Sequence, residues 1–256
     1  MTLVEYRKKE RLVTITLNRP EKLNALSREL LEELRGAWLR YRDDDDAWVA
    51  ILTGAGSAFS AGADKSWFAE ALDGQDSLGR FLDAVLRDPY WSGELDKPTI
   101  VAVNGYAIGA GFDLVLRADL RVAGESATFQ LPEVERGNIV PVWDNLPYAI
   151  TAEIVSGFTL TAQRAYDVGM INRVVPDEQL LDAATELAEA LLSRPPLVLQ
   201  HALGTLRERK NSGALVSTNL LRLYTTAVSK ELTKTEDGRE AAAALLEKRK
   251  PVFRKR

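Results

Sequence analysis

"PTIVAVNGYAIGAGFDLVL", residues 98–116, joins a continuous apolar run, three glycines and a single aspartate. The apolar run is typical of a strand buried on both faces, as in a parallel sheet covered by helices. Gly105, Gly109 and Gly111 lower helix propensity just where a helix is about to begin, and Asp113 stands where a buried apolar residue is expected. The stretch therefore predicts a strand, a turn of unusually bare backbone, and a helix that carries one carboxylate.

The segments on either side of this stretch repeat the alternation of strand and helix. "RLVTITL", residues 11–17, alternates apolar and polar residues as a half-buried strand does, and Ser27 can cap the helix expected over 28–42. Further strands are expected in three short segments: 48–54, 119–124 and 170–175. The first three quarters of the chain are thus predicted to be α/β.

The pattern changes after "SRPP", residues 193–196, since the remaining segments have helical spacing and none resembles a strand. We therefore expect an α/β core over residues 1–195 and a helical region over residues 196–256.

Composition narrows the classes of function. The 256 residues are 46% hydrophobic and 27% charged, with a net charge of −4 and no cysteine. These values are typical of a globular domain and argue against binding nucleic acid through bulk charge, against disulfides and against thiolate chemistry. No apolar run has membrane-spanning length, and the N-terminus lacks an apolar signal core. A soluble, cytoplasmic protein with no nucleic-acid or membrane partner is expected.

Several common catalytic and nucleotide-binding motifs are absent. Gly109 and Gly111 would begin a dinucleotide fingerprint, but Leu114 occupies the position of its third glycine. The sequence contains neither a P-loop motif nor a G-x-S-x-G nucleophile elbow. His201 is the only histidine, which argues against a Ser-His-Asp triad and a histidine-rich metal site. Carboxylates, tyrosine and lysine remain for proton transfer.

Two small-residue turns are the strongest binding candidates. "GAGSAFSAGADKSWF", residues 54–68, follows a predicted strand, and a helix is expected to begin near Asp64. "AIGAG", residues 107–111, makes a similar turn before the helix that contains Asp113. Amides at helix starts lack internal partners, so two facing turns could hold one developing oxyanion. Alternatively, both turns are ordinary strand-to-helix connections.

Four linked motifs resemble the enoyl-CoA hydratase/isomerase (crotonase) superfamily. They are "LNRPEKLNAL" (17–26), "AFSAGAD" (58–64), the segment from "KPTIVAVNG" to "LPEVERG" (97–137) and "EKRKPVFRKR" (247–256). The resemblance implies a superhelical core of ββα units and a C-terminal helical region that builds homotrimers, often paired into homohexamers. It also implies an acyl-CoA thioester as substrate, with CoA as part of the substrate, no separate cofactor and no metal.

The resemblance also assigns catalytic positions. The oxyanion-hole amides fall on Ala63 and on Ala110, where family members usually have glycine. The two hydratase glutamates fall on Asp113 and Glu133, which can share one water between an acid and a base. Asp113 is one methylene shorter than the usual glutamate, and an Asp here also resembles family members that isomerise dienoyl-CoA substrates.

Contacts to CoA follow from the same motifs. Lys22 and Leu23 match the segment that approaches the nucleotide, and Ala61 and Asp64, together with the oxyanion alanine between them, match the backbone around adenine. Lys248 matches a basic residue that reaches CoA, often from a neighbouring subunit. Ordinary solvated charge is the alternative for both lysines.

Two tryptophans and a departure from the family pattern could affect the pocket that binds the acyl group. Trp67 and Trp91 could line the acyl channel or simply pack. After the second acid, Pro141 and Trp143 could reshape the acyl pocket, and Asp144 could be a third carboxylate or a helix cap.

The sequence thus favours a lyase that hydrates a 2-enoyl-CoA, or dehydrates the 3-hydroxyacyl-CoA. The alternatives are an isomerase that moves the double bond of an enoyl- or dienoyl-CoA, and a non-catalytic acyl-CoA-binding protein.

Overall fold

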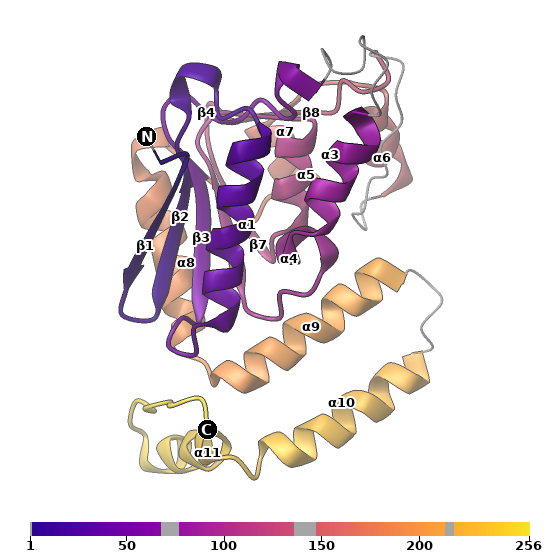
Figure 1. The fold of residues 1–256 in the computed structure, drawn as a ribbon. Helices are drawn as coiled ribbons and strands as arrows, with labels where there is room; N and C mark the ends of the chain where they lie inside the picture. Colours follow the sequence, from indigo (N-terminus) through magenta and orange to yellow (C-terminus); the bar gives the residue numbers. More distant parts are fainter. Residues whose placement is uncertain (1, 68–76, 136–146, 213–217) are drawn as a thin grey trace.

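The structure is a computed structural model that describes residues 2–67, 77–135, 147–212 and 218–256. Its centre is a six-stranded sheet in the order β1-β2-β3-β5-β7-β10 (Figure 1). The strands are β1 Val4–Lys9, β2 Leu12–Leu17, β3 Val49–Gly54, β5 Thr99–Val103, β7 Leu120–Gly124 and β10 Arg173–Val175. Every neighbouring pair is parallel except the β1–β2 hairpin. The predicted parallel sheet is therefore confirmed.

A second sheet of four short strands has the order β4-β6-β8-β9. These strands are β4 Ala58–Ser60, β6 Tyr106–Ile108, β8 Thr128–Gln130 and β9 Leu160–Thr161. The first three of them follow β3, β5 and β7 directly along the chain. Each pair places one strand in the large sheet and one in the small sheet, which is the ββ part of the expected ββα unit.

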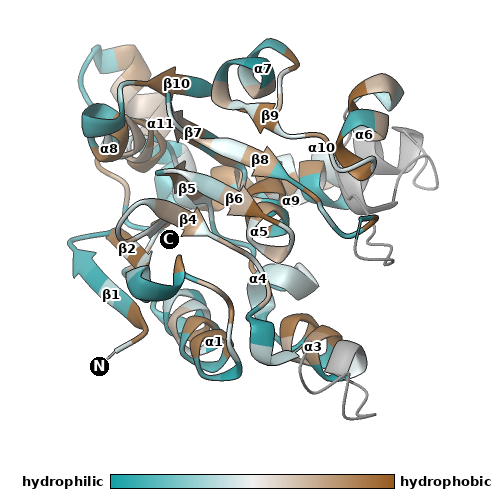
Figure 2. Ribbon diagram, turned by 90° about the horizontal axis from the view of Figure 1, so that it is seen from above, coloured by the Kyte–Doolittle hydropathy of each residue, from teal (hydrophilic) through white to brown (hydrophobic). Residues whose placement is uncertain are grey.

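Helices cover both faces of the large sheet (Figure 2). Those in the α/β part are α1 Arg28–Asp43, α3 Ser77–Leu86, α4 Pro89–Ser92, α5 Ala110–Arg117, α6 Tyr148–Val155, α7 Ala162–Asp167 and α8 Leu180–Leu192. Two 3₁₀ turns lie between a strand and a helix: η1 Pro20–Lys22 between β2 and α1, and η2 Asp177–Gln179 between β10 and α8. The α1 helix begins where predicted, because the Ser27 side chain accepts a hydrogen bond from the Leu30 amide at 3.3 Å.

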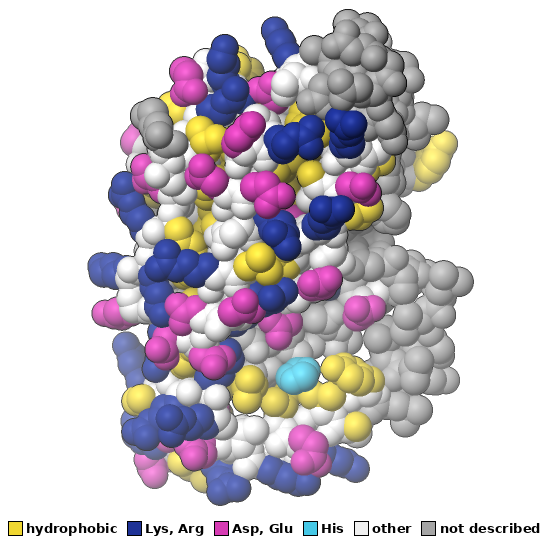
Figure 3. Space-filling model, in the orientation of Figure 1, with side chains coloured by type: hydrophobic (Ala, Val, Ile, Leu, Met, Phe, Trp, Pro, Cys, Tyr) yellow, Lys and Arg dark blue, Asp and Glu magenta, His cyan; other side chains and the backbone are white. Residues whose placement is uncertain are grey.

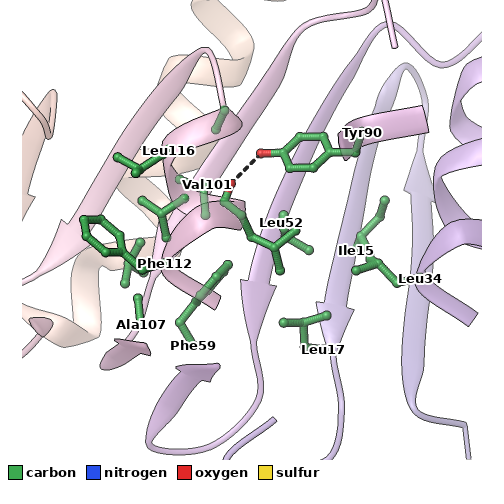
Figure 4. Packing of buried hydrophobic residues seen from close by; sticks show 14 of the residues in the cluster. Ile15, Leu17, Leu34, Leu52, Phe59, Tyr90, Val101, Ala107, Phe112 and Leu116 are labelled. Atoms are coloured by element: carbon green, nitrogen blue, oxygen red, sulfur yellow. Dashed lines mark hydrogen bonds between the residues drawn. The ribbon is translucent and has the colours of Figure 1, made fainter. Parts of the chain in front are cut away.

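The main core lies between the two sheets and the helices α1, α4 and α5 (Figure 4). All residues of β5 are buried, as its continuous apolar run predicts. Tyr90 stacks on Trp38 with ring centroids 4.5 Å apart, and its hydroxyl donates to the Leu114 carbonyl at 2.9 Å. These contacts fix α4 between α1 and α5. A second core forms where α8 packs on the opposite face of the large sheet.

The last three helices form what we call the C-terminal arm: α9 Pro196–Ser212, α10 Thr218–Leu232 and α11 Glu236–Glu247. In Figure 1, α9 and α10 lie below the α/β part. Arg207 ties α9 to it by donating to Asp119 Oδ1 at 2.8 Å and to the carbonyl oxygens of Leu95 and Lys97. After α11 the chain returns, and Phe253 is buried in the second core. Within the described residues, no helix has the length and hydrophobicity to cross a membrane.

Candidate active site

The two small-residue turns lie side by side, at the ends of neighbouring parallel strands. β4 pairs with β6, so the turn after Ser60 and the turn after Ile108 leave the same edge of the small sheet. Gly62 touches the second turn so closely that a Cβ there would lie 2.5 Å from the Ile108 carbonyl oxygen and 3.3 Å from the Ala110 nitrogen. Bare backbone at Gly62 is therefore what allows the two turns to meet.

The amides of Ala63 and Ala110 are both available at this meeting point. The Leu26 amide donates to the Gly62 carbonyl at 2.8 Å, and the Asp64 amide donates to the Leu26 carbonyl at 3.2 Å. Leu26 is thus paired with the Gly62 carbonyl and the Asp64 amide, on either side of Ala63. The Ala63 N–H therefore faces away from Leu26. Ala110 is the first residue of α5, where helix amides lack internal partners. Neither N–H donates to an acceptor among the described residues.

Glu133 lies against the start of α5. Its segment continues β8, and the Gln130 carbonyl accepts a hydrogen bond from the Gly109 amide at 2.8 Å. A Cβ added at Gly109 would lie 2.5 Å from Glu133 Oε1, and Gly109 has φ +55°. The side chain of Glu133 thus occupies the space that a side chain at residue 109 would need, and its carboxylate lies against the residue that precedes the first turn of α5. The sequence singled out Gly109 as a helix-weakening residue, and this contact explains why residue 109 must be a glycine.

Asp113 lies one helical turn beyond Gly109 on the same face of α5. Its Oδ2 accepts two hydrogen bonds, from Trp91 Nε1 at 2.6 Å and from Arg117 Nε at 2.9 Å. Trp91 is buried, and its ring N–H reaches Asp113 from α4. Sequence reasoning missed Arg117, although its i,i+4 spacing from Asp113 on a predicted helix was a usable signal.

Five of the residues assigned to CoA and to the oxyanion hole line one cavity of about 780 Å³. They are Lys22, Leu23, Ala61, Ala63 and Asp64. Arg19, Glu21, Ala25, Lys65 and Ile108 complete its lining. The structure does not bring Lys248 to this cavity, because Lys248 caps the C-terminal end of α11 in the arm.

An ion pair and a backbone hydrogen bond, both to Asp64, shape this cavity. Arg19 Nη1 contacts Asp64 Oδ2, and the Ser66 amide donates to Asp64 Oδ1 at 2.9 Å. Burial acts to raise the pKa of Asp64, but the hydrogen bonds from Ser66 and Arg19 outweigh it and the pKa lies below its usual range. Asp64 is therefore a fixed anion that holds Arg19 at the wall of the cavity.

Asn24 is a structural residue that sequence reasoning missed. It is fully buried, has φ +53° and donates from Nδ2 to the carbonyl oxygens of Ala55 and Ala58, at 2.9 and 2.7 Å. Its Oδ1 accepts from the Arg19 amide at 2.9 Å. Asn24 therefore ties the segment of Lys22 and Leu23 to the connection between β3 and β4. Asparagine tolerates the left-handed region, which was the signal available.

The remaining candidates are placed as follows. Trp67 is buried and donates from Nε1 to the Leu26 carbonyl at 2.9 Å, which is a packing role. His201 lies on α9 in the arm, with Nδ1 3.4 Å from the Tyr224 hydroxyl. The side chains of Pro141, Trp143 and Asp144 lie outside the described residues. Among those that are described, no group of three metal-binding side chains is close enough to hold an ion.

Comparison with known proteins agrees with this geometry. A family model described as enoyl-CoA hydratase/isomerase matches residues 7–256. The chain belongs to this family, also called the crotonase superfamily. Carnitinyl-CoA dehydratase of Salmonella enteritidis is 36% identical over 253 residues, which cover 96% of this chain and 95% of that protein. Enoyl-CoA hydratase EchA19 of Mycobacterium tuberculosis is 34% identical over 255 residues, covering 94% and 92% of the two chains.

Solved crotonase structures share the fold over the whole chain. The crystal structure of an enoyl-CoA hydratase from Mycobacterium tuberculosis has a TM-score of 0.86, with 30% identity and 100% of both chains covered. An enoyl-CoA hydratase/isomerase from Mycobacterium paratuberculosis has a TM-score of 0.84, with 31% identity and coverage of 100% and 99%. The predicted crotonase fold is confirmed, and this family implies an acyl-CoA substrate.

Proposed function

We propose that this crotonase hydrates a 2-enoyl-CoA, or dehydrates the corresponding 3-hydroxyacyl-CoA, with no cofactor beyond the CoA of the substrate. The observation that carries the proposal is the contact of Glu133 with Gly109, which puts a carboxylate at the start of α5, where the turn of Ala110 meets the turn of Ala63. The names of the relatives, a hydratase and a dehydratase, support the same reaction type.

In this mechanism the amides of Ala63 and Ala110 bind the thioester carbonyl oxygen. Their stabilisation grows as negative charge develops on that oxygen, so it favours the enolate over the ground state. Glu133 takes a proton from water while the water oxygen bonds to the β-carbon. The protonated Glu133 then gives a proton to the α-carbon, so that one water is added and the carboxylate is restored.

Double-bond isomerisation is the second candidate, and one observation favours it. Asp113 Oδ2 is already bonded to Trp91 and Arg117, so this acid is less available for proton transfer than Glu133. An isomerase needs only one carboxylate to remove a proton from one carbon and return it to another.

The cavity beside Lys22 is proposed to hold the CoA nucleotide. Arg19, Lys22 and Lys65 supply positive charge to a ligand that carries phosphates. Lys248 lies in the arm, so in this proposal it reaches CoA only from a neighbouring subunit of a homotrimer or homohexamer.

The test measures the absorbance of a conjugated 2-enoyl-CoA with wild-type protein and with Glu133→Gln. We expect the wild type to remove the conjugated signal, and Glu133→Gln to slow this by about 10²- to 10⁴-fold, the usual effect of losing a positioned proton donor or acceptor. Arg173→Met, which alters an exposed ion pair far from the site, is the control. A wild type that only migrates double bonds would support the isomerase, and one that binds acyl-CoA without turnover would rule out both reactions.

A further inference from the structure

Trp91, Asp113 and Arg117 form a closed ring of hydrogen bonds. Trp91 Nε1 and Arg117 Nε both donate to Asp113 Oδ2, at 2.6 and 2.9 Å. Arg117 closes the ring by donating from Nη1 to the Trp91 carbonyl at 2.7 Å. Hydrogen bonds that involve charged groups are roughly twice as strong as neutral ones, so the ring fixes the carboxylate in one orientation.

The ring occupies one oxygen of Asp113 and leaves the other open. No described side chain or amide donates to Oδ1, and the Asp113 side chain keeps 24% of its surface exposed. Asp113 follows Gly109 by one turn on the same face of α5, and Glu133 Oε1 lies against Gly109. The open oxygen therefore belongs to the face of α5 whose first turn Glu133 contacts, the carboxylate that is proposed to carry the proton.

We propose that Arg117 and Trp91 are positioning residues that fix Asp113 as a water-orienting anion, while Glu133 alone accepts and returns the proton. This inference rests on the proposed hydration. Asp113 Oδ1 accepts a hydrogen bond from the attacking water, and the other proton of that water passes to Glu133. No proton is left on Asp113 at any point, so its ion pair with Arg117 persists through the cycle.

This division of roles separates two reactions of the same site. Hydration needs an oriented water and therefore needs the ring. Exchange of an α-proton of a saturated acyl-CoA with solvent needs only Glu133 and the two amides. Glu133 removes the proton, the enolate is held by Ala63 and Ala110, and a solvent deuteron returns through Glu133. A ring that served only to pack α4 on α5 would affect both reactions equally.

The experiment measures hydration of a 2-enoyl-CoA and deuterium incorporation into a saturated acyl-CoA in D₂O. Arg117→Met and Trp91→Phe each remove one donor while keeping similar bulk. We expect each to lower kcat for hydration by roughly 10- to 100-fold, as the loss of a hydrogen bond to a charged group predicts, with KM nearly constant. Deuterium incorporation should stay within about twofold of wild type. Arg117→Lys should restore part of the hydration rate, and it serves as the second variant if Arg117→Met does not fold.

The other outcomes are equally informative. Equal losses in both reactions would show that the ring is only structural, and unchanged hydration would show that it does not position Asp113; either result overturns the inference. Glu133→Gln should slow both reactions by about 10²- to 10⁴-fold. A wild type that exchanges the α-proton but does not hydrate would instead refute the proposed function.

Discussion

The site end of the molecule and the C-terminal arm differ in how far contacts within one chain pair their polar groups and bury their apolar side chains. Around the site, the buried Asn24 and the half-buried Asp64 are held by hydrogen bonds within the chain. In the arm, Val198, Leu206 and Tyr224 are exposed and line an apolar groove between α9, α10 and α11. Figure 3 shows hydrophobic side chains gathered beside the histidine in this region. The site end is thus organised by interactions within the chain, whereas the arm presents apolar surface that water solvates poorly.

The largest effect is expected at the contact between Gly109 and Glu133. Gly109→Ala would place a Cβ 2.5 Å from Glu133 Oε1 at a residue with φ +55°, so the carboxylate must move. We expect kcat for hydration to fall by about 10²-fold or more, because a displaced proton carrier loses most of its contribution. Steady-state kinetics and circular dichroism would check this.

Gly36→Ala is the matched control, since a Cβ there meets no atom within 4 Å on the exposed side of α1. It should keep wild-type activity and stabilise the helix by up to about 1 kcal/mol. Full activity of Gly109→Ala would mean that Glu133 does not need its observed position.

The second effect concerns stability at the site end. Asn24→Ala leaves the buried carbonyl oxygens of Ala55 and Ala58 without their donor and puts alanine at φ +53°. We expect the free energy of unfolding to fall by about 3 kcal/mol, from unmade buried hydrogen bonds and the left-handed backbone. Urea unfolding measures it, with Asn18→Ala, whose amide bonds are more exposed, as the control. Equal losses in the two variants would contradict the role given to Asn24.

Comparison with the sequence shows why some of this could be predicted. The alternation of Val13, Ile15 and Leu17 predicted β2, and the continuous apolar run predicted β5, because each pattern extends over enough residues to be recognised. The strands of the small sheet have two or three residues, too few to show one. Their ββα arrangement was expected only from the family resemblance.

The candidate site also has a part that could be predicted from the sequence and a part that could not. Ala63, Ala110 and Glu133 were assigned from motifs, and the structure places the two turns and Glu133 together. The ring around Asp113 could not be predicted, because Trp91 lies 22 residues from it along the chain and reaches it only through the packing of α4 on α5. Local spacing carries no information about such a contact.

A third prediction concerns the support of Trp91. Asp88 is buried and caps α4 by accepting from the Tyr90 amide at 2.8 Å. Burial raises the pKa of Asp88 to about 7, against the opposing backbone hydrogen bonds of Tyr90 and Trp91. The folded state therefore holds this proton more tightly than the unfolded state does. Stability from this group is full below about pH 4 and is lost as the pH rises through about 7.

As the pH rises from 5 to 7, ionisation of Asp88 should lower the free energy of unfolding by about 2 kcal/mol. Asp88→Asn keeps an oxygen for the cap and cannot ionise, so it should remove that part of the pH dependence. Urea unfolding of both proteins at pH 5, 6, 7 and 8 compares the slopes. Parallel curves would show that Asp88 titrates alike in the folded and unfolded states.

The smallest effect is expected in the arm, and it tests whether the exposed apolar groove is covered by other copies of the chain. Leu206 is 60% exposed in the groove, so Leu206→Glu costs one chain little but places a charge in the proposed interface between subunits. Light scattering at micromolar concentration should show wild-type trimers or hexamers and a threefold or larger fall in mass for the variant. Leu181→Glu, at a 51% exposed position on α8, is the control and should keep the wild-type mass.

Hydration by the dissociated variant should show a raised KM for acyl-CoA if Lys248 of a neighbouring subunit completes the CoA site. A monomeric wild type would mean that the arm is complete within one chain after all, and the contrast between the two regions would not hold.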